Sequence, residues 1–372
     1  MRRFRFISIS LFLFAFIINV VSSKFPQLVE EYYSNGINIY IVKILSKISS
    51  VLPFSLFEIL IYIGVISIIG FIIYSIIYIS KNPKSILSYL KNSILNIISI
   101  VGLIYFIFIA LWGLNYNRMD LANSLIVDYN KTNNQNIKEV EYDEDDLKDL
   151  YKFLVGKCNE IRHDVLENEN GVMKNNTDYR EVLSRAKDGY ENVHILNLNK
   201  KGSYATAKPI LNSNLLCYTS ITGIYSPFTG EANVNVAAPD YYIPFTTLHE
   251  MAHQRGYASE DEANFLAYIA GINHEDYDFQ YSAYILALNY TASAFSRADY
   301  NNYVQLTRTL SDEVRNDIKK SSEFWSQYEG KVSEVSDNVN NTYLKSNGVK
   351  EGTQSYGKVV ELLLTYYQLY EK

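Results

Sequence analysis

The stretch His249-Glu250-Met251-Ala252-His253 has the pattern H-E-x-x-H in a chain of 372 residues that contains only five histidines. Residues four apart lie on the same face of an α-helix, so both imidazoles can reach one metal ion. Neutral histidine nitrogens are zinc ligands, and a glutamate beside such a site can take a proton from water. The pattern therefore predicts His249 and His253 as zinc ligands and Glu250 as the catalytic residue. A surface helix with two solvated histidines is the plain structural alternative.

The residues around this pattern predict where its helix begins and ends. Pro244 suits the first helical turn, because the N–H that proline lacks would have no partner there. Gly256 follows the second histidine as a helix stop, so we predict a helix over residues 244–255. A second helix is predicted to open at Ser259, which forms the pattern of a capping box with Glu262.

A third zinc ligand is needed, and the nearest carboxylates lie in the first turn of the second predicted helix. H-E-x-x-H followed by E-x-x-A-N resembles the zincin metallopeptidases of the gluzincin type, in which a glutamate on the following helix completes a His-His-Glu site. The resemblance implies Glu260 as the third ligand and Asn264 as the residue that orients a ligand histidine. Glu262 is the alternative third ligand. The metzincin pattern is not met, because Ser259 stands where its third histidine would be.

A second resemblance covers most of the chain. Three apolar N-terminal segments, the stretch from Ser226 to Asn235 and the late motif Ser355-Tyr356-Gly357 resemble an uncharacterised bacterial membrane family. That family is catalogued as a domain of unknown function and is grouped with the zincin peptidases. The resemblance implies the same layout and metal site, and it implies no substrate, because the family has none assigned.

The three apolar segments cover residues 7–21, 59–79 and 94–114 and contain no charged residue. A helix of about 20 residues crosses the hydrocarbon core of a membrane. We therefore predict a multi-pass membrane region over residues 1–114 with three transmembrane helices. The first segment is short and follows three arginines, so a cleaved signal peptide is the alternative to a retained span.

Basic residues around these segments predict their orientation. They are Arg2, Arg3 and Arg5 before the first segment, and Lys81, Lys84 and Lys91 in the short loop between the second and third segments. Such residues stay on the cytoplasmic side, so residues 115–372 are predicted to lie outside the cell. The outer connection has apolar residues at helical spacing, which predicts either an interfacial helix or a helix packed on the spans. These residues are Ile37, Ile41, Ile44, Ile48 and Leu52.

The charge of the chain excludes one class of partner. Residues 115–372 carry 25 basic and 37 acidic residues, a net charge of −12. Nucleic-acid binding requires a basic face, so no nucleic-acid partner is expected. The acidic run over residues 139–146 is predicted to be a linker or the start of a helix, since it lacks the spacing of a calcium loop.

The fold predicted for residues 115–372 is mainly α with a small β-sheet, and the gluzincin resemblance implies a zincin-like α+β catalytic domain. Helical spacing of apolar residues is found over 142–166, 279–298, 299–338 and 358–372. Residues 232–238 alternate apolar and polar instead, which predicts a strand with one packed face. A short sheet before the H-E-x-x-H helix could pair its exposed edge with an extended peptide; sheet packing alone explains the pattern equally well.

We predict no role in the metal site for the two cysteines or for the three other histidines. Cys158 and Cys217 are predicted to be independent buried or free thiols, with a disulfide as the alternative. His163, His194 and His274 are predicted to lie on the surface, although His274 follows the second predicted helix and could reach the site.

These patterns lead to one functional hypothesis. We expect a membrane-anchored zinc metallopeptidase that hydrolyses a peptide or protein substrate, for example one of the cell envelope, at the outer face of the lipid bilayer. A sensor or assembly protein with a structural zinc site and an amidase of cell-wall peptides are the alternatives. An intramembrane protease is disfavoured, because the acidic residues Glu260, Asp261 and Glu262 follow the H-E-x-x-H helix.

Overall fold

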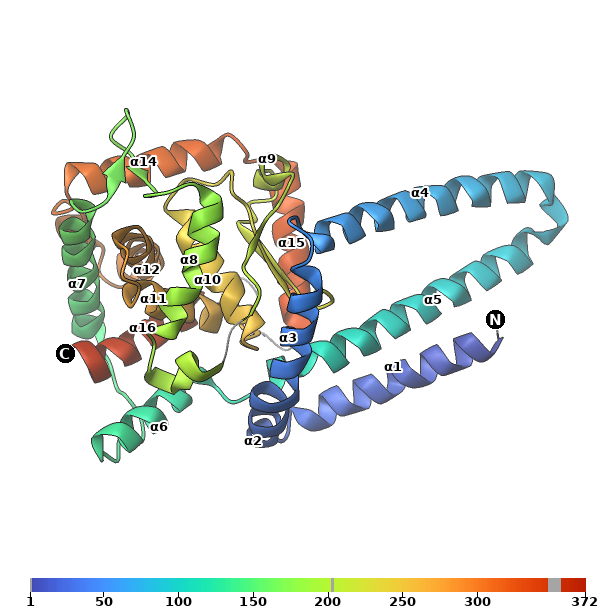
Figure 1. Cartoon of the computed structure of the whole chain (residues 1–372), viewed down its shortest axis with the longest axis horizontal. Helices are drawn as coiled ribbons and strands as arrows, with labels where there is room; N and C mark the ends of the chain where they lie inside the picture. Colours follow the sequence, from blue (N-terminus) through green and yellow to red (C-terminus); the bar gives the residue numbers. More distant parts are fainter. Residues whose placement is uncertain (1, 202–203, 347–355) are drawn as a thin grey trace. The chain divides into compact units, whose positions relative to one another are not determined.

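The computed structural model of the chain describes residues 2–201, 204–346 and 356–372, shown in Figure 1. The chain forms two compact units. The membrane unit consists of residues 1–118 together with 226–231, and the helical unit consists of 119–225 and 232–372. The first division between the two units lies after Arg118, and the predicted domain boundary after residue 114 stays a prediction. The short segment 226–231 belongs to the membrane unit although it is distant in sequence.

The membrane unit is helical apart from its turns and the strand residues Ser226 and Glu231. Its elements are α1 (Arg2–Ser22), α2 (Pro26–Leu28), the π-helical η1 (Val29–Ile37), α3 (Asn38–Ser49), α4 (Leu56–Lys81), the 3-10 turn η2 (Pro83–Ser85), α5 (Ile86–Leu111) and the 3-10 turn η3 (Gly113–Asn117).

Three helices of this unit, α1, α4 and the segment 83–111 that contains α5, are long and apolar enough to cross a membrane. They correspond to the three predicted spans with shifted ends. The third begins earlier and ends at Leu111 rather than at residue 114, because Trp112 leaves helical geometry with φ −157° and a 3-10 turn follows. Lys91 therefore lies within α5 and not in a loop.

Helices α1 and α5 pack side by side in the same direction (Figure 1). Arg5 donates to Asn92 and Asn96 in the first half of α5, while Asn19 accepts from Asn117 just beyond its end. Small residues allow close approach of two such helices. Because α1 and α5 run in the same direction, the basic groups that precede these two helices lie at the same end of the spans.

The segment 226–231 packs tightly within the membrane unit. The Glu231 carboxylate accepts hydrogen bonds from the backbone N–H groups of Leu56 (3.0 Å) and Phe57 (2.8 Å), which have no partner within α4. Gly230 has a φ of +67°, and a Cβ there would lie 2.8 Å from the backbone nitrogen of Ser46 in α3. Only glycine therefore fits at this point of the turn.

The helical unit contains most of the remaining helices and all of the described strands. Its elements are α6 (Leu121–Asn133), α7 (Glu144–Arg162), β1 (Leu166–Glu167), β2 (Met173–Lys174), α8 (Tyr179–Glu191), the 3-10 segment η4 (Ile195–Lys201), β3 (Lys208–Pro209), α9 (Ser213–Cys217), β4 (Gly223–Ser226), β5 (Glu231–Val234), α10 (Tyr242–Gln254), α11 (Glu260–Ile272), α12 (Tyr277–Ala298), α13 (Tyr300–Thr307), α14 (Asp312–Ser326), α15 (Lys331–Ser346), α16 (Tyr356–Tyr366) and the π-helical η6 (Tyr367–Glu371). One residue at each of the inner ends of the β4–β5 turn, Ser226 and Glu231, is counted with the membrane unit.

The core of the helical unit is built around α10 and α11, which are buried over most of their length. They pack against each other and against α8, α12 and α16. A second buried contact of α12 involves Asp317 of α14. Its carboxylate accepts hydrogen bonds from Arg162 (2.7 Å), the backbone of Met173 (2.7 Å) and Tyr281 (2.6 Å). A buried carboxylate with a cation and two further donors is well satisfied, so this network joins α7, β2, α12 and α14.

The small sheet corrects the prediction for residues 232–238. The strand there is β5, and in the three-stranded sheet it lies between β3 and β4. Both of its edges are paired and all four of its residues are buried, so the prediction of only one packed face is wrong. Within the described residues β4 takes an edge position, as does β3, which is parallel to β5 with Lys208 opposite Asn233.

Several other predictions can be compared with the structure. The acidic run is a helix start, with Asp143 as the cap of α7 in a capping box. Residues 299–338 form α13, α14 and the first half of α15 rather than one helix. Cys158 and Cys217 are both buried and free.

The surface assignment is wrong for His274, although His163 and His194 are exposed. His274 is buried, stacks on the ring of Phe279 with centroids 3.9 Å apart, and its Nε2 lies 3.1 Å from the carbonyl oxygen of Arg185. Aromatic stacking and a backbone partner make it a core residue of the α8–α12 contact.

Candidate metal centre

The H-E-x-x-H pattern lies on α10, which runs from Tyr242 to Gln254 and so begins two residues before the predicted start. His249 and His253 are one helical turn apart, and their Nε2 atoms are separated by 3.1 Å. Gly256 has a φ of +81°, a conformation that glycine adopts without strain, and it reverses the chain after α10.

The reversal at Gly256 brings the first residue of α11 to the two histidines. The Glu260 carboxylate lies 3.1 Å from Nε2 of His249 and 3.7 Å from Nε2 of His253. One ligand atom from each of the three residues lies within 4.8 Å of the others. The structure therefore brings together the three residues predicted as metal ligands.

The hydrogen bonds at Nδ1 indicate which nitrogen of each histidine ring carries a hydrogen. Nδ1 of His249 lies 2.8 Å from Oδ1 of Asn264, and Nδ1 of His253 lies 2.6 Å from the carbonyl oxygen of Tyr257. Both partners are acceptors, so each Nδ1 carries a hydrogen, and in the neutral form of each ring Nε2 presents a lone pair. Tyr290 also donates to Oδ1 of Asn264 at 3.0 Å, which fixes that side chain.

The resulting donor set fits a tetrahedral cation. With both rings neutral, two Nε2 lone pairs and a carboxylate would face one another, so the cluster favours a cation among them, either a proton on a histidine or a metal ion. Zinc bonds of about 2.0–2.1 Å imply about 3.3–3.4 Å between neighbouring ligand atoms of a tetrahedron. The observed separations of 3.1, 3.1 and 3.7 Å are close to that value.

The alternative ligand, Glu262, points elsewhere. Its carboxylate accepts a hydrogen bond from the backbone N–H of Leu121 at the start of α6, at 3.1 Å. The predicted capping box is also absent, because the Ser259 side chain forms no cap hydrogen bond at the start of α11. Of the two glutamates, only Glu260 lies with the histidines.

Glu250 lies beside this cluster and is buried, with 4% of its surface exposed. One oxygen, Oε1, faces Gly223 of β4, where a Cβ would lie only 2.4 Å away. The other oxygen, Oε2, is buried and has no hydrogen-bond partner in the described part of the chain. A buried carboxylate oxygen without a donor is costly, and such costs are typical of functional groups.

Burial also changes the proton affinities of the cluster. It raises the pKa of Glu250 to about 7, although His249 and His253 act in the opposite direction. Burial lowers the pKa of His253, but the neighbouring Glu260 carboxylate outweighs it and raises this pKa to about 9. For Glu260 burial is likewise outweighed, and hydrogen bonds from both histidines hold its pKa well below the usual range.

A family model described as "Protein of unknown function (DUF3810)" matches residues 33–364, which include α4, α5 and the whole cluster. The chain belongs to this family. The predicted membership of an uncharacterised family is thereby confirmed. No curated protein and no solved structure matches the chain.

Several residues of this candidate centre were not predicted from the sequence. Gly223 comes from β4, Tyr257 contributes only its carbonyl oxygen, and Tyr290 comes from α12. No spacing rule connects Gly223 or Tyr290 to the H-E-x-x-H pattern, because their proximity arises from tertiary packing. The carbonyl of Tyr257 follows from the tight turn after Gly256, which the short interval between His253 and Glu260 does indicate.

Replacing Gly223 by alanine is expected to reduce any activity that depends on Glu250, by up to about 10²-fold, while metal binding is retained. The added methyl group would displace the Glu250 carboxylate, and the nearby backbone of β4 has little freedom to move. Turnover and bound metal should be measured together. Gly156→Ala is the matched control, because nothing lies within 4 Å of a Cβ at that position. Equal activity of the two variants would contradict the role of Gly223.

The raised pKa of Glu250 predicts a pH-dependent stability of the protein, to be measured in the presence of a chelator. Above the usual pKa of 4.5 the unfolded chain releases its proton more readily than the folded chain, so stability is lost as the pH rises toward 7. Glu250→Gln removes this loss. The variant should be more stable than the parent by about 2–4 kcal/mol above pH 7 and equal to it below pH 4.5. Thermal unfolding of the chelated proteins at both pH values tests this; a difference that does not vary with pH would contradict it.

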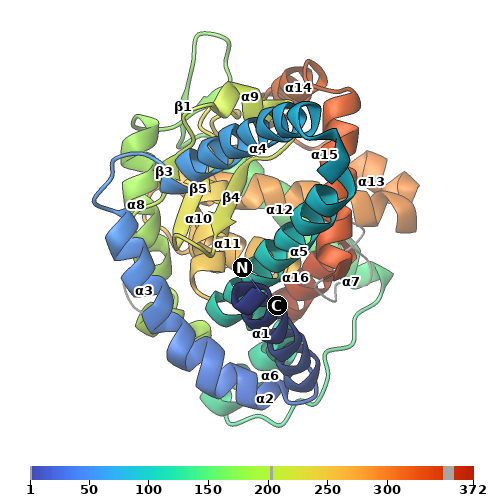
Figure 2. The same cartoon turned by 90° about the vertical axis from the view of Figure 1, so that its right-hand side faces the viewer.

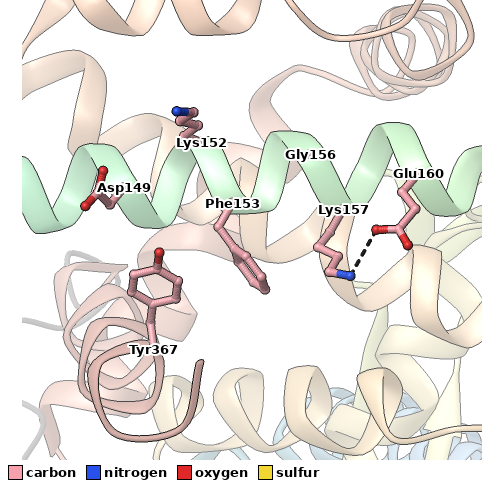
Figure 3. A pocket seen from close by; sticks show the side chains of 7 residues that line it. All are labelled: Asp149, Lys152, Phe153, Gly156, Lys157, Glu160 and Tyr367. Atoms are coloured by element: carbon pink, nitrogen blue, oxygen red, sulfur yellow. Dashed lines mark hydrogen bonds and ion pairs between the residues drawn. The ribbon is translucent and has the colours of Figure 1, made fainter. Parts of the chain in front are cut away.

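A separate hollow lies on the outer face of α7 in the same unit (Figure 3). Its lining residues are Asp149, Lys152, Phe153, Gly156, Lys157, Glu160 and Tyr367. Lys157 and Glu160 pair with each other at 2.9 Å, and the rings of Phe153 and Tyr367 are in contact. The lining contains no residue of the metal cluster, so this hollow is not the candidate active site.

Proposed function

We propose that this DUF3810 chain is a membrane-anchored zinc metallopeptidase with a zincin-like, gluzincin-type catalytic unit. His249, His253 and Glu260 would hold the zinc ion, Asn264 would orient His249, and Glu250 would be the catalytic residue. The observation that carries the proposal is the convergence of three ligand atoms beside a buried carboxylate oxygen that has no donor among the described residues. A structural zinc site does not require a proton acceptor, so it would not explain a carboxylate in this position.

The chain's own residues account for the proton transfers of peptide hydrolysis. Bound zinc would polarise the scissile carbonyl and make a water molecule more acidic. Glu250 would accept the proton of the attacking water and later give it to the leaving amine nitrogen. Burial raises the pKa of Glu250 and so makes its carboxylate a stronger base than an exposed one, which favours its taking a proton from water.

The sheet supports a peptide as the substrate. β4 lies at an edge of the sheet, carries Gly223 against Glu250, and places the ring of Tyr225 6.2 Å from that of His253. An extended peptide that adds to such an edge is held by backbone hydrogen bonds. A peptide bound along β4 would thus lie next to the general base.

The membrane unit supports a location at the cell membrane. The basic residues before α1 and around the α4–α5 turn lie at one end of the spans, which the positive-inside rule assigns to the cytoplasm. We accordingly propose that residues after α5 face the outside of the cell. Protein or peptide substrates of the cell envelope would be within reach there.

Metal analysis and a peptide-library digest of the full-length protein in detergent test the proposal. We expect about one zinc ion per chain, and cleavage that disappears with a chelator and returns when zinc is added. Bound zinc without cleavage of any peptide would favour the structural-zinc sensor or assembly protein instead. Cleavage confined to cell-wall peptides would favour the amidase, which would use the same residues.

A further inference from the structure

Helix α3 of the membrane unit has an inverted distribution of side chains. Its buried positions are Asn38, Val42, Ser46 and Ser49, of which three are polar. Its exposed side is apolar instead. A helix on the surface of a water-soluble protein shows the reverse arrangement, with polar residues outward.

The polar side of α3 is used by contacts within its own unit. The Asn38 amide donates to the carbonyl oxygen of Leu111, at the C-terminal end of α5, at 2.7 Å. Asn115 donates to Asn38 at 3.2 Å and accepts from Ser34 at 2.8 Å. These bonds attach the start of α3 to the end of a membrane span.

The apolar side of α3 forms one continuous stripe with no protein covering it in the described part of the chain. Ile44 and Ile48 are 60% and 64% exposed, and Tyr40 is 69% exposed. The neighbouring Ile37 and Val51 extend the stripe by about one turn at each end and are exposed as well. Contiguous exposed apolar surface marks an interaction site rather than an ordinary surface.

The surroundings of α3 indicate what covers this stripe. The connection that contains α3 begins at the end of α1 and ends at the start of α4, so membrane spans enclose it on both sides. Figures 1 and 2 show α3 running across the direction of α1, α4 and α5, as a helix in the plane of a membrane surface would. Lys43 and Lys47 flank the stripe, and α3 contains no acidic residue.

We propose that α3 lies in the lipid–water interface of the bilayer, with Tyr40, Ile44 and Ile48 among the acyl chains and the two lysines at anionic headgroups. Amphipathic helices of this kind bury their apolar face about 5–10 Å into the boundary of headgroups and chains. Because Gly230 lies against α3, the turn 226–231 is held at the membrane surface as well. This inference concerns the membrane unit and does not depend on the proposed hydrolase activity.

Fluorescence quenching in vesicles tests the position of α3. The full-length protein with Ile44→Cys is labelled with an environment-sensitive fluorophore and placed in vesicles of phosphatidylcholine and phosphatidylglycerol, with and without lipids brominated in the acyl chain. The native thiols Cys158 and Cys217 are fully buried and should remain unlabelled, which the parent chain checks. Ser50→Cys is the matched control, because Ser50 is exposed at the end of the same helix and away from the stripe.

The brominated lipid should quench the label at position 44 several-fold more than the label at position 50. Equal quenching, or quenching of position 44 by aqueous iodide instead, overturns the proposal. Absence of lipid quenching combined with cross-linking of Ile44→Cys between two chains would show that a second copy covers the stripe, which also overturns it. If Ile44→Cys does not fold, Ile48→Cys on the same stripe repeats the measurement.

Discussion

Replacing Glu250 by glutamine is expected to lower peptide hydrolysis by about 10²–10⁴-fold while zinc remains bound. Glutamine has the shape of glutamate, but its amide cannot take a proton from water. Glu250 is not among the three residues whose ligand atoms converge, so its replacement should not remove a ligand. The turnover number on one peptide substrate and the zinc content of the same preparation are the two measurements.

The zinc content also serves as the folding control for this experiment, since a misfolded chain would lose the site. Glu329→Gln provides a second control, because Glu329 is an exposed glutamate next to a loop glycine. It should keep full turnover. If Glu250→Gln retains turnover like this control, Glu250 is not the general base and the catalytic proposal fails.

The parts of the centre that lie within one helix could be predicted from the sequence. His249 and His253 share a face because α-helical geometry repeats every 3.6 residues, whatever the rest of the chain does. Asn264 follows Glu260 by the same interval of four on α11, so it comes to the same end of the site. The turn between the two helices was indicated by Gly256, whose left-handed φ the structure confirms.

The parts that depend on tertiary packing could not be predicted. Residues Glu260 and Glu262 both precede the same apolar run, and no local pattern shows that α6 packs where the backbone of Leu121 can donate to Glu262. The same holds for Gly223, whose requirement for glycine comes from a carboxylate 27 residues later in the chain. Local patterns contain no information about such neighbours.

The fold shows the same division. Long apolar segments predicted the spans, because crossing a membrane requires length and hydropathy alone. The strand at 232–234 was predicted from its alternation, but its central place in the sheet depends on β3 and β4. Segment 226–231 belongs to the membrane unit because of the contacts of Gly230 and Glu231. No pattern in the sequence of the turn predicts these contacts.

Replacing Glu260 by alanine is expected to weaken zinc binding by more than about 10–100-fold, the loss typical of a residue that only supports a ligand, and to abolish activity with it. Glu262→Ala is the matched variant two residues away and should keep both zinc and turnover, because its carboxylate serves the backbone of Leu121. Zinc titration of the chelated proteins separates the two. The opposite result, with zinc lost only from Glu262→Ala, would mean that α11 rotates when metal binds. Loss of zinc from neither variant would leave His249 and His253 without a third protein ligand, and the geometry at Glu260 would then reflect only its ion pair with these histidines.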